Sequence, residues 1–74
     1  MKYGGMKFVR VRSYLQSGEL AAEQLYLGEN QYEALERFRR DYPEHQNCVL
    51  VAETVDGDDP KNEEYIRVCI GCTW

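Results

Sequence analysis

Two pairs of metal-binding side chains are the first feature of this sequence that could support chemistry. His45 and Cys48 form one pair, Cys69 and Cys72 form the other, and two residues separate the partners in each. Zinc sites are built from pairs with this spacing. The four side chains therefore predict a zinc site, in which Gly71 lets the chain turn between ligands.

Other interpretations of these four residues stay open. Cysteine is often buried as a small apolar side chain, and the C-x-x-C near the end of the chain suits free thiols or a disulfide as well as a metal. His45 follows the predicted helix 30–43 and suits a solvated helix end. Cys69 lies in the middle of a predicted strand, whose extended backbone does not form a metal-binding knuckle.

Arginines and aromatic residues at alternate positions suggest a second kind of site. In a strand, alternate side chains point to the same face of the sheet. One face of the predicted sheet therefore displays a set rich in rings and guanidinium groups: Phe8, Arg10, Arg12, Tyr14, Gln24, Tyr26, Tyr65 and Arg67. This composition is typical of a protein-binding hot spot, and also of a platform on which unpaired bases stack. A third interpretation is a solvated face, because tyrosine also favours strands.

Little in the sequence indicates catalysis or calcium binding. The chain has one histidine, and no serine or cysteine has the surroundings of a known nucleophile motif. Residues 56–64, DGDDPKNEE, are rich in acids, but they lack the glycine and closing glutamate of a calcium-binding EF-hand loop. We therefore expect no enzyme and no calcium site, and residues 56–64 are expected to form a solvated loop.

Composition limits the classes of protein to which the chain could belong. With 74 residues, 43% hydrophobic and 30% charged, it suits one small globular domain, expected at 6–74 after a loose lead-in at 1–5. The net charge of −4 disfavours binding to duplex nucleic acid, which requires neutralised phosphates. No apolar run approaches the roughly 18 residues of a membrane span, and the N-terminus lacks the apolar core of a secretion signal. The odd count of three cysteines argues against a secreted disulfide scaffold, so a cytoplasmic location is expected.

Residues 30–43, NQYEALERFRRDYP, give the strongest local signal in the chain. Asn30 and Glu33 have the spacing of a capping box, which predicts the start of a helix. The apolar side chains then recur on one stripe of that helix, with Phe38 near its centre. Pro43 disfavours helical geometry at the preceding residue, so the helix should end there.

Alternating apolar residues predict strands on both sides of this helix. Residues 6–15 alternate, and Leu20–Leu27 pairs with them in a hairpin that brings Val11 opposite Leu25. A helix through residues 18–41 is the alternative, but it would place Gly28 in a helix interior at a cost of about 1 kcal/mol. Residues 48–55 and 64–70 predict a second hairpin, which would bring Cys48 close to Cys69 and Cys72.

The predicted fold is α+β, a two-layer ββαββ arrangement with one helix packed on a four-stranded, largely antiparallel sheet. The other face of the sheet is then open to partners. We expect a binding module whose partner is a protein or a second copy of the chain. The alternatives are a single-strand nucleic-acid binder, which the acidic charge disfavours, and a structural module stabilised by zinc.

Overall fold

A computed structural model describes residues 4–28 and 30–73 of the chain, with side chains described up to residue 69. Three strands and two α-helices follow in the order β1 (Lys7–Tyr14), β2 (Leu20–Leu27), α1 (Gln31–Asp41), β3 (Val49–Asp56) and α2 (Glu63–Thr73). Short 3-10 turns, Pro43–His45 and Pro60–Asn62, precede β3 and α2. The fold is α+β, but its sheet has three strands, so the predicted four-stranded ββαββ arrangement is wrong.

The hairpin of β1 and β2 is confirmed, with a register one residue away from the predicted one. Gly18 in the turn and Gly28 after β2 both have positive φ, the left-handed conformation that glycine adopts without strain. Val11 lies opposite Gln24, whereas the sequence pattern placed it opposite Leu25. Because side chains alternate along a strand, this shift moves every side chain of β2 to the other face of the sheet.

Strand β3 forms where a strand was expected, but its partner is different. It pairs antiparallel with β1 along its whole length, so β1 is central and the strand order is β2-β1-β3. The predicted hairpin between β3 and residues 64–70 does not exist. Both β2 and β3 are edge strands of the sheet.

Residues 63–73 form helix α2, which corrects the predicted fourth strand. Asp59 accepts the N–H of Lys61, Pro60 begins the preceding turn, and Glu63 and Glu64 lie in the first helical turn. These are start signals of a helix. The β-branched residues of this segment favoured a strand, but burial of a helical stripe against the sheet outweighs that weak preference.

Helix α1 begins as the sequence predicts. Asn30 Oδ1 accepts the Glu33 N–H at 2.8 Å, and the two side chains are also hydrogen-bonded to each other. Tyr42 caps the helix by donating its N–H to the Phe38 carbonyl. The sequence before Pro43 therefore determines both ends of the helix by local interactions.

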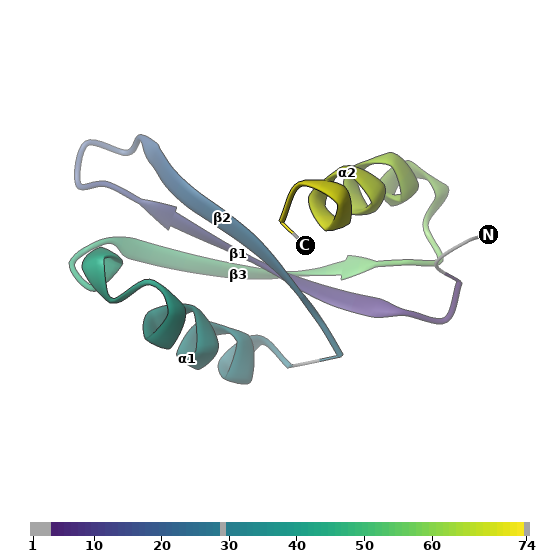
Figure 1. Cartoon of the computed structure of the whole chain (residues 1–74), viewed down its shortest axis with the longest axis horizontal. Coiled ribbons are helices and arrows are strands. Elements are labelled where there is room, and N and C mark those ends of the chain that lie inside the picture. Colours follow the sequence, from purple (N-terminus) through teal and green to yellow (C-terminus); the bar gives the residue numbers. More distant parts are fainter. Residues whose placement is uncertain (1–3, 29, 74) are drawn as a thin grey trace.

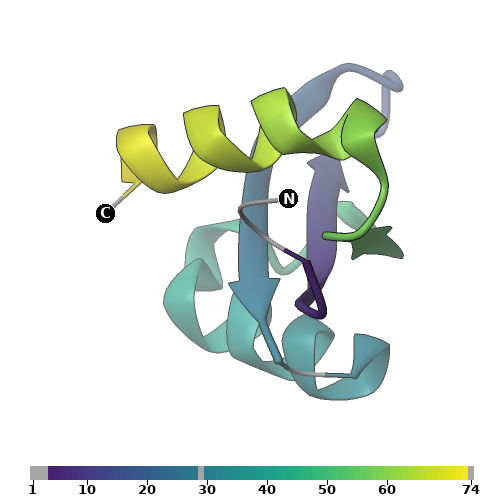
Figure 2. The same ribbon diagram turned by 90° about the vertical axis from the view of Figure 1, so that its right-hand side faces the viewer.

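The two helices cover opposite faces of the sheet, which makes three layers (Figures 1 and 2). On the α1 side, Val9, Val11 and Tyr26 of the sheet pack against Ala34 and Phe38 of the helix. On the α2 side, a smaller core forms from Phe8, Leu25, Val55 and Ile66. The predicted open face is therefore partly covered by a helix that the sequence pattern did not reveal.

Candidate functional site

The predicted arginine and tyrosine surface is divided among three places. Arg10, Arg12 and Tyr14 lie on the face that α2 partly covers, and Phe8 is buried beneath that helix. Tyr26 and Gln24 point to the opposite face, where Tyr26 is buried and donates to Asp41. Tyr65 and Arg67 belong to α2 rather than to the sheet, and Arg67 pairs with Glu64 in solvent.

Arg10 and Arg12 form ion pairs across the sheet. Arg10 donates to Glu53 of β3 at 2.8 Å, and Arg12 donates to Glu23 of β2. Each acid lies directly opposite its arginine in the strand register, which is the geometry in which cross-strand pairs interact most strongly. The two predicted cationic binding residues of β1 are therefore already neutralised by carboxylates.

Tyr65 joins α2 to this charged row. Its hydroxyl donates to Glu23 at 2.7 Å, and the Arg10 guanidinium lies 5.5 Å from the centre of its ring. Burial of Glu23 by itself raises the pKa of that carboxyl group, but hydrogen bonds from Tyr65 and Arg12 more than offset the effect, so its pKa lies below the ordinary value. Burial, together with the hydrogen bond to Glu23, raises the pKa of Tyr65.

Replacing Glu23 by Gln is expected to lower the free energy of unfolding at pH 7 by about 1–3 kcal/mol, because Arg12 and Tyr65 each lose a charged acceptor. The pKa of Glu23 is depressed in the folded state, so ionised Glu23 stabilises the fold above its unfolded-state pKa. That stabilisation is lost as pH falls through the folded-state pKa. The measurement is urea unfolding of both proteins from pH 7 downward.

The control for this prediction is Glu19→Gln, at an exposed position in the turn before β2. It should change the unfolding free energy by less than about 0.5 kcal/mol at every pH. A gap between wild type and Glu23→Gln that stays constant below pH 4 would contradict the assigned role of the carboxylate.

An exposed apolar area lies beside this charged row, at the end of the sheet that α2 does not cover. We call it the open patch, and it consists of Tyr14, Leu20, Val49 and Val51. The register places Leu20 and Val49 on either side of Tyr14. Leu20 is 49% exposed, Val49 53% and Val51 38%, although all three are apolar. Figure 1 shows α2 over the other end of the sheet, where β1 begins and β3 ends.

Sequence reasoning missed most of this patch. Tyr14 was predicted from alternation in β1, but Val49 and Val51 were assigned to a hairpin with residues 64–70. The signal for them was present, since alternation puts both on one face of β3. Their exposure depends on where α2 ends, which alternation does not report.

The predicted zinc ligands are not brought together by the residues that the structure describes. His45 lies on the α1 side of the sheet with Cys48, whose Sγ is 3.9 Å from His45 Nδ1. Cys69 lies on the α2 side, packed against the core of Phe8 and Ile66. The Cys72 side chain lies outside the described residues. Within the described part of the chain, no three His, Cys, Asp or Glu residues are close enough to share a metal ion.

His45 has a partner that the sequence did not indicate. Its Nδ1 lies 3.1 Å from Ser13 Oγ, and Ser13 is fully buried in β1. The imidazole also packs edge-on against the rings of Phe38 and Tyr42. These contacts attach the turn after α1 to the sheet, and the buried hydroxyl is not accessible to a substrate.

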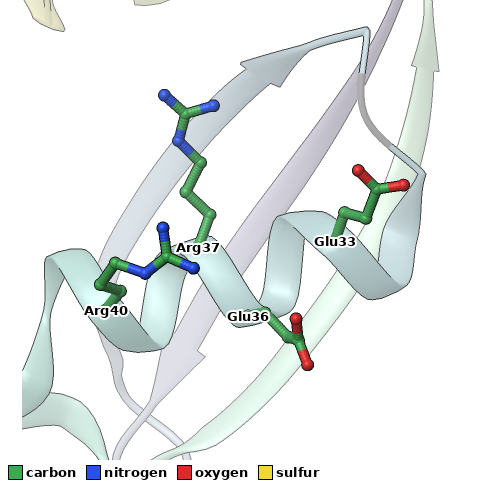
Figure 3. Close-up of a pocket in the computed structure, with 4 residues that line it drawn as sticks. All are labelled: Glu33, Glu36, Arg37 and Arg40. Atoms are coloured by element: carbon green, nitrogen blue, oxygen red, sulfur yellow. The ribbon is translucent and has the colours of Figure 1, made fainter.

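A shallow hollow on α1 is lined by Glu33, Glu36, Arg37 and Arg40. In Figure 3 the four charged ends diverge from the helix instead of converging on one point. A second hollow lies between α1 and β2, next to Tyr26, where the Arg37 guanidinium is 5.8 Å from the ring centre. Ligand pockets are usually apolar with a few converging polar groups, and neither hollow has that character.

None of the helices in the described residues has both the length and the apolar character to cross a membrane. Comparison of the chain with protein-family models, curated proteins and solved structures gives no match.

Proposed function

We propose that this protein is a non-enzymatic protein-binding module that contacts its partner through the open patch. The observation that carries the proposal is the exposure of Leu20, Val49 and Val51, which lie on either side of Tyr14 across the sheet. Contiguous exposed apolar side chains beside a polar rim are characteristic of protein interfaces. Tyr14 at the centre supplies the kind of aromatic anchor that dominates binding energy, and the ion pairs of Arg10 and Arg12 form the rim.

The same geometry gives less support to single-strand nucleic-acid binding. Arg10 and Arg12 are engaged by carboxylates, so a phosphate would have to displace Glu53 and Glu23. Tyr26 is buried and cannot stack on a base. The net charge of −4 adds a repulsive background. The zinc hypothesis has less support for a different reason, since His45 and Cys69 lie on opposite faces of the sheet.

Leu20→Asp is the variant that tests this proposal. Leu20 is half-exposed, so the change should leave folding nearly intact, but it places a charge within the predicted contact. The partner is first captured on immobilised wild type after nuclease treatment and identified by mass spectrometry. The purified partner is then titrated, and we expect the variant to bind at least about tenfold more weakly, which corresponds to about 1.4 kcal/mol.

Val68→Asp is the matched control, because Val68 is also half-exposed but lies on α2, away from the open patch. It should bind within about twofold of wild type. Equal weakening by both variants would show that added negative charge, and not the patch, matters. Capture that requires nucleic acid would replace the proposal with the nucleic-acid alternative.

A further inference from the structure

The outer edge of β3 has unpaired main-chain groups in a regular array. Gly57 donates its N–H to the Met6 carbonyl, and this pair continues the β1–β3 register. Because paired residues alternate along an antiparallel ladder, Val51 and Glu53 bond to β1, whereas the main-chain groups of Leu50, Ala52 and Thr54 point outward. Within the described residues, no hydrogen bond reaches those three outward groups.

This edge also lacks several of the features that usually prevent strand pairing. Residues 49–56 contain no proline, lysine or glycine, and their register with β1 has no bulge. The other edge strand, β2, has an irregular register near Leu20, where β1 passes from Ser13 to Tyr14. At the far end of β3, the Asp56 carbonyl is occupied, since it accepts from the Asn62 side chain. The free edge is therefore confined to residues 49–55.

From this array we infer that the chain also binds a second copy of itself, and that two β3 strands pair antiparallel to form one continuous six-stranded sheet. This inference rests on the proposed protein-binding function. The two-fold axis stands perpendicular to the sheet at Ala52, so that Ala52 faces its own copy and Leu50 faces Thr54 of the second copy. The outward N–H and C=O groups of Leu50, Ala52 and Thr54 then pair with those of the second copy, which gives about six main-chain hydrogen bonds.

Side chains select this register over its neighbours. An axis at Glu53 would put two like charges directly opposite each other and would require the occupied Asp56 carbonyl. An axis at Val51 would leave Thr54 without a partner. With the axis at Ala52, Val51 lies opposite Glu53 of the second copy, and Val49 lies opposite Val55. The half-exposed Val49 and Val51 thereby become interior positions of the sheet.

Charge complementarity on the α1 face supports the same two-fold arrangement. Arg37 lies over Tyr26 of β2, so the opposite flank of α1, which carries Arg39, faces the β3 side. Along the helix, the acidic Glu33 lies in the first turn and the basic Arg39 and Arg40 lie in the last turn. Gln31 on that helix also donates to Thr54 of β3 at 3.2 Å. The two-fold axis reverses one α1 relative to the other, which brings the acidic half of each helix toward the basic half of its copy.

Introducing a negative or a positive charge at Val51 tests both the interface and its register. Val51→Glu places a carboxylate opposite Glu53 of the second copy, once on each side of the two-fold axis, and should weaken the dimer at least about tenfold. Within one protomer, however, the new acid lies opposite Arg12, which suits the monomer fold. Val51→Lys should retain the dimer, because lysine meets Glu53. Val68→Glu, on α2 and away from β3, should dimerise like wild type. The readout is mass by light scattering and sedimentation over a concentration series.

Amide exchange of the wild type provides a test that needs no variant. The amides of Val51 and Glu53 bond within the protomer and should be protected at every concentration. Those of Leu50, Ala52 and Thr54 should become protected only where the mass is twice the 8.7 kDa of one chain. A dimer whose outward amides remain unprotected would overturn the inference.

A wild type that is monomeric at all concentrations would also overturn the inference. If that monomer still binds a different protein through Leu20, the proposed function stands without the self-pairing. If it binds no protein at all, both fail.

Discussion

Replacing Phe38 by Ala is expected to cost about 3–5 kcal/mol of unfolding free energy, the range for truncating a fully buried phenylalanine. Phe38 is completely buried and packs against Val9, Val11 and Tyr26 of the sheet. Its ring also contacts Tyr42, with ring centres 4.6 Å apart. A domain of this length has a stability of about 4–11 kcal/mol, so the variant should lose a large fraction of its stability and melt at a much lower temperature. Thermal and urea unfolding followed by circular dichroism measure the effect.

Tyr32→Ala on the same helix is the control, since Tyr32 is 71% exposed. It removes an aromatic ring of similar size and should change the unfolding free energy by less than about 0.5 kcal/mol. If the two variants melt at the same temperature, the assigned buried face of α1 is wrong.

Replacing Ile66 by Ala is expected to cost about 2–5 kcal/mol, because it leaves a cavity between α2 and the sheet. Ile66 is fully buried and belongs with Phe8, Leu25 and Val55 to the core between α2 and the sheet, against which Tyr65 and Cys69 of α2 also pack. Loss of this contact should also expose Phe8 to solvent. Urea unfolding gives the free energy, and binding of a hydrophobic dye at low urea would report a detached α2.

Val68 provides the matched control two residues later in the same helix. A strand at residues 64–70 would point both side chains inward, whereas helix α2 buries Ile66 and leaves Val68 50% exposed. Val68→Ala should therefore be neutral or slightly stabilising, since alanine favours helix more than valine does. Similar losses at the two positions would contradict the helical face.

Local chemistry in the sequence was sufficient for α1 and for the existence of β1, β2 and β3. The Asn30 cap, the Gly28 break and Pro43 act on neighbouring residues, so the effect of each can be predicted from the sequence without knowledge of the rest of the fold. Alternation in β1 likewise placed Arg10, Arg12 and Tyr14 on one face, as the structure has them.

The candidate site was predictable only where it depends on β1. Tyr26 was expected beside Arg10, but the one-residue shift of β2 buries it against α1. Tyr65 does approach Arg10, although it does so from a helix. Val49 and Val51 join the site because β3 pairs with β1 and α2 stops short of them.

The sequence by itself determined which local segments form strands in residues 6–28 and where the helix after them begins and ends. The strand register, the strand order and the helical structure of residues 63–73 were decided by the tertiary structure. The reason is that both faces of β1 carry apolar side chains, Phe8 on one and Val9 on the other. Burying the second face requires a helix there, and that demand outweighs the local preference of β-branched residues for a strand.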